Sequence, residues 1–96
     1  MQLEFTFRNI DPTDAIKNWA NKRFKKVTKH LKDPTSAHLT VTVDKHRHRA
    51  ELTVHSHGEI LRVEDETSDM YATLDQVMSK LEQSAQRQKE RLIETR

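Results

Sequence analysis

Residues 37–54 read AHLTVTVDKHRHRAELTV, and this stretch decides the fold. Apolar and polar residues alternate over 37–43, and the same alternation returns over 50–54. A period of two is typical of a strand that buries one face and exposes the other. The polar residues 44–48 lie between the two runs. We therefore predict two strands joined by a turn, within a sheet that has one covered face.

Two amphipathic helices are predicted on either side of these strands, because apolar residues recur there at helical spacings. We expect Asp11 to be the N-cap of the first helix, Pro12 to take its first helical position, and the helix to end near Lys32. Ser68 is expected to cap the second helix. The apolar stripes are Ile16, Ala20, Phe24, Val27 and Leu31 in the first helix and Met70, Leu74, Val77, Leu81, Ala85 and Leu92 in the second.

Residues 2–7 alternate as well and predict a first strand, and residues 60–64 predict a weaker fourth strand. The predicted fold is therefore α+β with the order β-α-β-β-β-α, a four-stranded sheet with two helices packed on one face, similar to double-stranded RNA-binding domains. A sheet with only one covered face fits the composition, since 33% of the residues are hydrophobic and another 33% are charged. The uncovered face would carry Thr40, Thr42, Glu51, Thr53 and Arg62.

The composition excludes several classes of protein. The chain has no Cys, which removes disulfides, thiolate metal sites and Cys nucleophiles and fits a reducing cytosol. The longest apolar run is 70–72 and the amino end alternates, so we expect neither a membrane span nor a secretory signal. The sequence shows no Ser/His/Asp arrangement and no phosphate-binding Gly loop. We therefore expect no enzymatic activity and no cofactor.

Positive charge is concentrated on the first predicted helix. Seven basic residues and no acid lie between Lys17 and Lys32, whereas residues 59–75 hold six acids and one Arg. A solvated helix face is the alternative explanation, but such a face usually mixes charges to gain i,i+4 pairs. If the helices lie side by side, their basic rows would form one patch for a polyanion. These rows are Lys22, Lys25, Lys26, Lys29 and Lys32 on the first helix and Lys80, Arg87 and Arg91 on the second.

Two His-x-His pairs raise the alternative of a metal site. His48 and His55 are separated by about seven residues of strand at roughly 3.3 Å each, which is too far for one shared ion. Neither pair has a third ligand at a motif spacing. We therefore expect no metal site, and we assign residues 46–49 to a hairpin tip that can contact phosphate.

Two further groups of residues have structural explanations. Four acids cluster before the second predicted helix: Glu64, Asp65, Glu66 and Asp69. We expect them just before and within its first turn, where the helix dipole favours negative charge, and not as a catalytic cluster. Trp19 and Tyr71 lie at the edges of the two apolar stripes. We expect both rings to pack at the edge of the core and not to stack on bases.

Residues 69–75, DMYATLD, and the following Lys80-Leu81 resemble a family pattern, D-M-Y-A-x-[IL]-D followed by K-L. It is the pattern of the ribosome hibernation promoting factors and their relative, the ribosome-associated inhibitor. HRAELTVH at 48–55 and LRVEDETSDMY at 61–71 are also similar to that family, and the resemblance covers the whole chain. It implies the fold predicted above and a cytoplasmic stress protein. Residues 1–96 would be a single ribosome-binding domain.

The resemblance also implies a mechanism. Family members bind the small ribosomal subunit in the channel for messenger and transfer RNA, contact 16S rRNA through basic residues of both helices, and so inhibit translation. By resemblance, Arg23 and Lys26 correspond to the family's basic residues on the first helix. Those on the second helix correspond to Lys80, Arg87, Lys89 and Arg91. The full set of candidate rRNA-binding residues is Lys22, Arg23, Lys25, Lys26, Lys29, Lys80, Arg87, Lys89 and Arg91.

Gln83 departs from the family, which usually has Arg after the K-L pair. The chain ends soon after Leu92 and resembles the short form of the family. That form implies a separate ribosome modulation factor for joining two ribosomes. We expect a monomer off the ribosome that binds neither DNA nor membranes.

Two rival hypotheses remain open at this point. One is an RNA-binding module of the double-stranded RNA-binding type. Its second helix would open with a basic cluster, whereas this one opens with Asp69. The other, less favoured, is a metal-binding protein that uses the His pairs.

Overall fold

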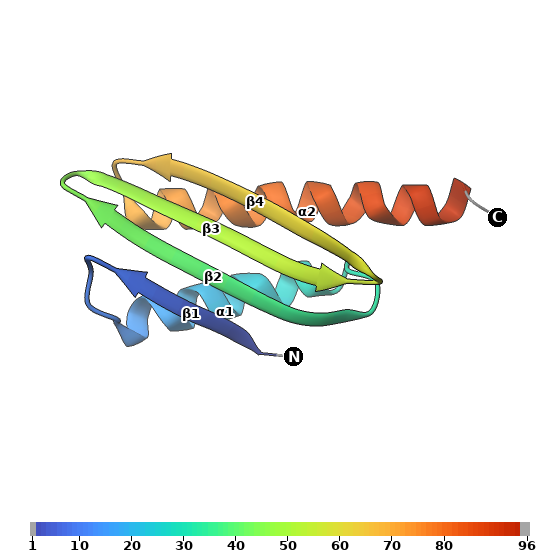
Figure 1. Ribbon diagram of the computed structural model, residues 1–96, viewed down its shortest axis with the longest axis horizontal. Helices are drawn as coiled ribbons and strands as arrows, with labels where there is room; N and C mark the ends of the chain where they lie inside the picture. The colour runs from blue at the N-terminus through green and yellow to red at the C-terminus, as the bar shows by residue number, and fades with distance from the viewer. Residues whose placement is uncertain (1, 95–96) are drawn as a thin grey trace.

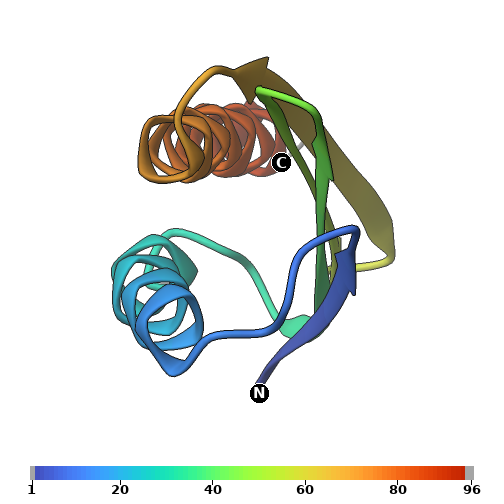
Figure 2. The ribbon, with the colours of Figure 1, turned by 90° about the vertical axis from the view of Figure 1, so that its left-hand side faces the viewer.

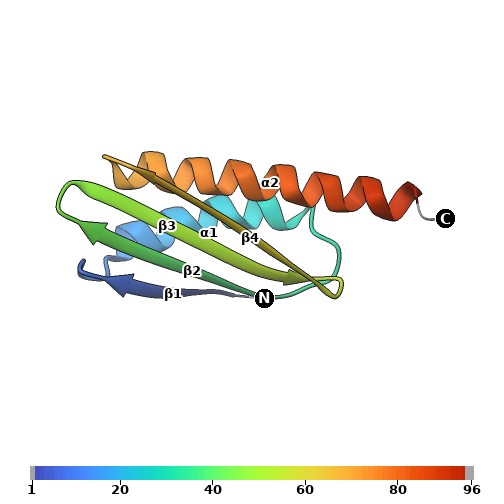
Figure 3. The same cartoon turned by 45° about the horizontal axis from the view of Figure 1, so that its top comes forward.

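The computed structural model describes residues 2–94 and shows four strands and two helices. They are β1 (Leu3–Arg8), α1 (Asp14–Thr28), β2 (Pro34–Asp44), β3 (Arg47–Ser56), β4 (Glu59–Thr67) and α2 (Met70–Glu94). The strands form one sheet in the order β1-β2-β3-β4 (Figure 1). Both helices lie against the same face of this sheet, as Figures 2 and 3 show. The predicted α+β fold with the order β-α-β-β-β-α is confirmed.

The sheet is mixed. β1 runs parallel to β2, whereas β2 with β3 and β3 with β4 form antiparallel hairpins. A parallel pair needs a long crossover, and α1 supplies it. One row of partners runs across the sheet from Phe5 through Leu39 and Leu52 to Val63. Leu39 and Leu52 are fully buried. The period of two therefore places one continuous apolar face towards the helices.

The core lies between this apolar face and the two helices. All five residues of the stripe predicted for α1 are buried, and so are the first five of the stripe predicted for α2. Leu92, the last of that stripe, is half-buried. Gln88 is fully buried although it is polar. Thr40, Thr42, Glu51, Thr53 and Arg62 lie on the opposite parity of their strands, as expected for the uncovered face.

The strands extend further than their apolar runs. Only Lys45 and His46 form the turn between β2 and β3, because residues on either side of them continue the ladder with backbone hydrogen bonds. β4 covers Glu59–Thr67 instead of the predicted 60–64. Its connection to β3 is the pair His57-Gly58, with φ angles of +50° and +76°. Positive φ at both positions is typical of the tight hairpin turn that matches strand twist.

α1 begins and ends at different residues from those predicted. Thr13 is the N-cap, because its backbone is extended and its hydroxyl accepts the Ile16 N–H at 3.1 Å. Asp11 and Pro12 therefore lie before the helix, and the prediction for both was wrong. The helix ends at Thr28, whose hydroxyl donates to the Lys25 carbonyl at 2.8 Å, and not near residue 32.

The cap predicted for α2 was also wrong. The helix begins at Met70, and the Asp69 carboxylate accepts the Ala72 N–H at 2.8 Å. The Thr67 hydroxyl accepts the Asp69 N–H at 3.0 Å and so fixes the turn from β4 into the helix. Ser68 is exposed. Asp69, one residue later, is therefore the N-cap, because its side chain is the one that reaches the free amides of the first turn.

Replacing Asp69 with Ala is expected to lower the free energy of unfolding by about 1 kcal/mol, because an amide of the first turn loses its partner. Ser68→Ala is the matched control and should change it by less than about 0.5 kcal/mol, as is usual for surface positions. Urea unfolding of both variants measures the difference. Equal losses in the two variants would contradict the assignment of Asp69 as the cap.

Candidate nucleic-acid interface

The most prominent charged feature is a row of lysines that begins on α1 and continues into the segment that follows it. We call it the α1 ridge: Lys22, Lys25 and Lys26 of the helix, and Lys29 and Lys32 after its end. All five are exposed, whereas the apolar stripe of α1 is buried against the core. Among the side chains of residues 2–92, no acid forms an ion pair with any of them. The ridge therefore presents uncompensated positive charge to solvent.

Arg23 lies on the same helix but differs from the ridge. Its side chain is 24% exposed and turns towards α2, where Nε lies 3.5 Å from Asp75 Oδ1 and Nη1 lies 3.8 Å from Glu82 Oε2. Nη2 also donates to the Ser79 hydroxyl at 3.3 Å. Arg23 therefore holds the two helices together, and its charge is compensated by two acids.

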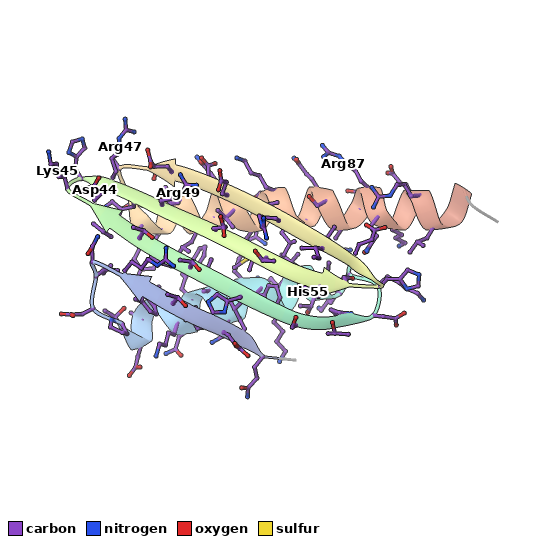
Figure 4. The ribbon with its side chains drawn as sticks, viewed as in Figure 1. Asp44, Lys45, Arg47, Arg49, His55 and Arg87 are labelled. Atoms are coloured by element: carbon purple, nitrogen blue, oxygen red, sulfur yellow. The ribbon has the colours of Figure 1, made fainter. Side chains whose placement is uncertain are left out.

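The basic residues of α2 are divided between its two flanks. Lys80 donates to the Glu64 carbonyl at 2.9 Å and lies 3.3 Å from Asp65 Oδ2. Arg91 forms an ion pair with Glu59. Both contacts lead to β4. Arg87 points away from α1, towards the top of the view in Figure 4. In the part of the chain that the structure describes, Arg87 has no ion pair.

Lys89 lies on the other flank of α2. It lines an open groove of about 480 Å³ between the end of α1, the turn from β3 to β4, and α2. The other lining residues are Lys29, His30, Leu31, Lys32, His57 and Leu92. The structure therefore brings Lys89 together with the end of the α1 ridge.

The two basic rows do not merge into the single patch that the sequence suggested. Lys80 and Arg91 contact β4. The side of α2 that meets α1 carries the acids Asp75 and Glu82, which pair with Arg23. The candidate interface on the α1 side thus consists of the ridge and Lys89.

Of the four acids predicted just before and within the first turn of α2, Asp69 lies directly before the helix, whereas the other three lie further away, in β4. Glu64, Asp65 and Glu66 belong to β4, and the first turn of α2 contains no acid. Glu64 Oε2 lies 2.7 Å from Arg49, and Glu66 Oε2 lies 3.5 Å from Arg47. Glu64 and Glu66 therefore pair with basic residues of the neighbouring strand β3, whereas Asp65 pairs with Lys80 of α2.

The pKa of Asp65 is lowered from its usual value. The main cause is the Glu66 backbone amide, which donates to Oδ1 at 2.8 Å; partial burial acts in the opposite direction, and Lys80 adds to the lowering. The backbone amide and the lysine therefore favour the charged form of this carboxylate. The arrangement is structural.

Asp65→Asn is expected to lower the free energy of unfolding at pH 7 by roughly 1 kcal/mol, the usual range for one hydrogen bond and an exposed ion pair. The folded pKa lies below the unfolded value of about 3.9, so this stabilisation is present above about pH 4. It is lost as the pH falls through the lower folded pKa. Thermal unfolding between pH 3 and 7 should show the two proteins converging in acid, whereas a constant difference would contradict the proposed cause.

The histidines do not assemble a ligand set. His57, in the turn after β3, has its Nδ1 3.2 Å from Asp33 Oδ2. His55 lies on β3 and is exposed (Figure 4). His48 Nδ1 is buried without a hydrogen-bond partner in the described residues. No group of three or more His, Cys, Asp or Glu side chains suited to a metal ion occurs within 2–94. Over the same residues, neither helix is long and apolar enough to cross a membrane.

Comparison with known proteins relates the whole chain to one group. The sequence model of the family described as "Sigma 54 modulation protein / S30EA ribosomal protein" matches residues 3–93. The ribosome hibernation promoting factor of Azotobacter vinelandii is 30% identical over 94 residues, which are 98% of this chain and 88% of the relative. The protein of that name from Salmonella typhimurium is 28% identical, over 96% of this chain and 97% of the relative.

Solved structures have the same fold. The N-terminal domain of Thermus thermophilus Protein Y superimposes with a TM-score of 0.81 at 28% identity, over 91% of this chain and 98% of that one. A ribosomal subunit interface protein from Coxiella burnetii gives a TM-score of 0.83 at 22% identity, over 93% of this chain and 98% of that one. At 22% identity, the similarity to the Coxiella burnetii protein shows a shared fold and nothing about function.

Proposed function

Because the chain belongs to the Sigma 54 modulation protein / S30EA ribosomal protein family, we propose that it is a ribosome hibernation factor that binds the small ribosomal subunit. In this proposal the chain is one cytoplasmic ribosome-binding domain. It occupies the channel for messenger and transfer RNA and contacts 16S rRNA, so that translation stops under stress or in stationary phase.

The observation that carries the proposal is the α1 ridge. Its lysines are exposed, and they lack acidic partners among the described residues. Phosphate contacts by such residues supply most of the sequence-independent affinity for nucleic acid. Lys22 and Lys29 are two helical turns apart, or about 10 Å, so the ridge can contact several phosphates at once.

The proposed mechanism is occlusion without a chemical step. The sheet and the core hold α1 in place, and the ridge binds rRNA phosphates. A bound domain would then exclude the normal ligands of the channel by its volume. With a separate ribosome modulation factor, the bound ribosomes would pair into inactive dimers.

Sedimentation with separated ribosomal subunits in modest salt tests the proposal. The protein should migrate with the small subunit, and inhibition in a reconstituted translation assay should saturate near one protein per ribosome. Migration with the large subunit alone, or with neither subunit, would contradict the proposal. Inhibition far below stoichiometry would instead indicate an enzyme that acts on RNA.

A further inference from the structure

Two aromatic rings meet at the seam between the helices. Trp19 of α1 and Tyr71 of α2 lie with their ring centroids 5.9 Å apart at an interplanar angle of 68°. Trp19 is half-buried and packs against the core, as predicted. Tyr71, however, is 42% exposed. The pair therefore forms an aromatic ledge, Trp19 and Tyr71, that is open to solvent on one side.

Basic side chains flank this ledge. Trp19 lines a shallow hollow of about 130 Å³ together with Lys22, Arg23 and Lys26. Lys22 and Lys26 belong to the α1 ridge and have no acidic partner within the described chain. The nearby acids of α2 are Asp75 and Glu82, and both are paired with Arg23. The hollow thus combines an aromatic wall with two uncompensated cations.

We propose that the ledge stacks an unpaired base of RNA whose neighbouring phosphates are bound by Lys22 and Lys26. The inference rests on the proposed function for the source of the RNA. Aromatic side chains bind splayed-out bases by stacking, and basic residues beside them follow the backbone. Duplex RNA is a poor ligand for the ledge, because its bases are already stacked on one another.

The geometry favours a nucleotide over other ligands. A phosphate alone would contact the lysines and leave the exposed ring of Tyr71 uncovered. Arg23 contacts Asp75, Glu82 and Ser79, so one wall of the hollow is held by contacts within the protein. A preformed wall lowers the cost of ordering on binding.

Trp19 is the only Trp of the chain, so its fluorescence reports on the ledge directly. Titration of the full chain with a short single-stranded RNA should quench this fluorescence, and so should small ribosomal subunits. Inorganic polyphosphate, which has charge but no bases, should leave it nearly unchanged. Quenching of equal depth by polyphosphate would overturn the proposal, because charge alone would then explain the signal.

Tyr71→Leu removes the exposed ring and should lower affinity for the single-stranded RNA about five-fold or more, the usual effect of losing one stacked base. Because no charge changes, the slope of log affinity against log salt should stay the same. Trp19→Leu should act in the same direction and Trp19→Phe should retain most of the affinity. Lys26→Gln is the contrasting variant, for which the salt slope should fall.

The outcomes separate this inference from the proposed function. Small subunits that bind without quenching, together with unchanged affinity in Tyr71→Leu, would overturn the stacking and leave the proposed function intact. Quenching by single-stranded RNA without binding to small subunits would support the ledge and contradict the proposed function. Loss of affinity for a protein ligand but not for RNA in Tyr71→Leu would assign the ledge to a protein partner and overturn the inference.

Discussion

Replacing Lys22, Lys26 and Lys29 together with Gln is expected to weaken binding to the small ribosomal subunit about 100-fold at 0.1 M salt. Each lost phosphate contact lowers the slope of log affinity against log salt by somewhat under about one unit, so the triple variant should lose roughly two. Two units of slope correspond to two decades of affinity between 1 M and 0.1 M salt. The three side chains are exposed, so the fold should survive.

Filter binding or fluorescence anisotropy across a salt series measures this slope. Arg87→Gln with Arg91→Gln tests the opposite flank of α2 and should act in the same direction but more weakly, since Arg91 already pairs with Glu59. Glu64→Gln with Glu66→Gln should leave binding unchanged or slightly tighter. An unchanged slope in both basic variants would mean that the ridge is only a solvated face. The contact would then have to lie on the hairpin around Arg47 or on the open sheet.

Gln88→Ala is expected to lower the free energy of unfolding by about 2–4 kcal/mol, a large part of the stability of a domain of this size. Gln88 is fully buried, and its Nε2 donates to the Ser56 carbonyl at 3.1 Å. The Ser56 hydroxyl lies 3.4 Å from Gln88 Oε1 and also contacts the Lys32 carbonyl. The Ala variant leaves a cavity and removes the partner of a buried carbonyl at the junction of β3 and α2.

Two further variants identify the cause of the loss. Gln88→Leu keeps most of the volume but still leaves the Ser56 carbonyl unpaired, so it should cost about 1–3 kcal/mol. Gln86→Ala, at an exposed position of the same helix, should cost less than about 0.5 kcal/mol. Urea unfolding compares the three variants. A loss in Gln88→Ala no larger than that in Gln86→Ala would show that the buried amide does not stabilise the fold.

Periodicity was sufficient to predict the fold. The alternation over 37–43 and 50–54 became the antiparallel pair β2 and β3, and both predicted helix stripes became buried faces. The N-caps of both helices were predicted one or two residues too early, because a nearby Asp or Ser also has a side-chain oxygen that can accept a backbone N–H. Thr13 follows two residues after Asp11, and Asp69 follows Ser68; only the reach of each side chain to a free amide distinguishes them.

The candidate site was less predictable from the sequence. A helical wheel was enough to place the ridge on the exposed side of α1, because exposure follows from the position of the apolar stripe. The ion pairs of Arg23, Lys80 and Arg91 depend on partners in other elements. Gln88 likewise depends on Ser56, which lies 32 residues earlier. No local pattern reports such partners.

The parallel pairing of β1 with β2 has a consequence for the order in which the chain folds during its synthesis. Leu3 pairs with Ala37, so β1 has no partner until more than thirty further residues have been made. The hairpins β2–β3 and β3–β4, by contrast, close through two-residue turns. Contacts between distant residues form slowly, because a long loop must first be closed. Pairing of β1 with β2 is therefore expected to be slower than closure of either hairpin.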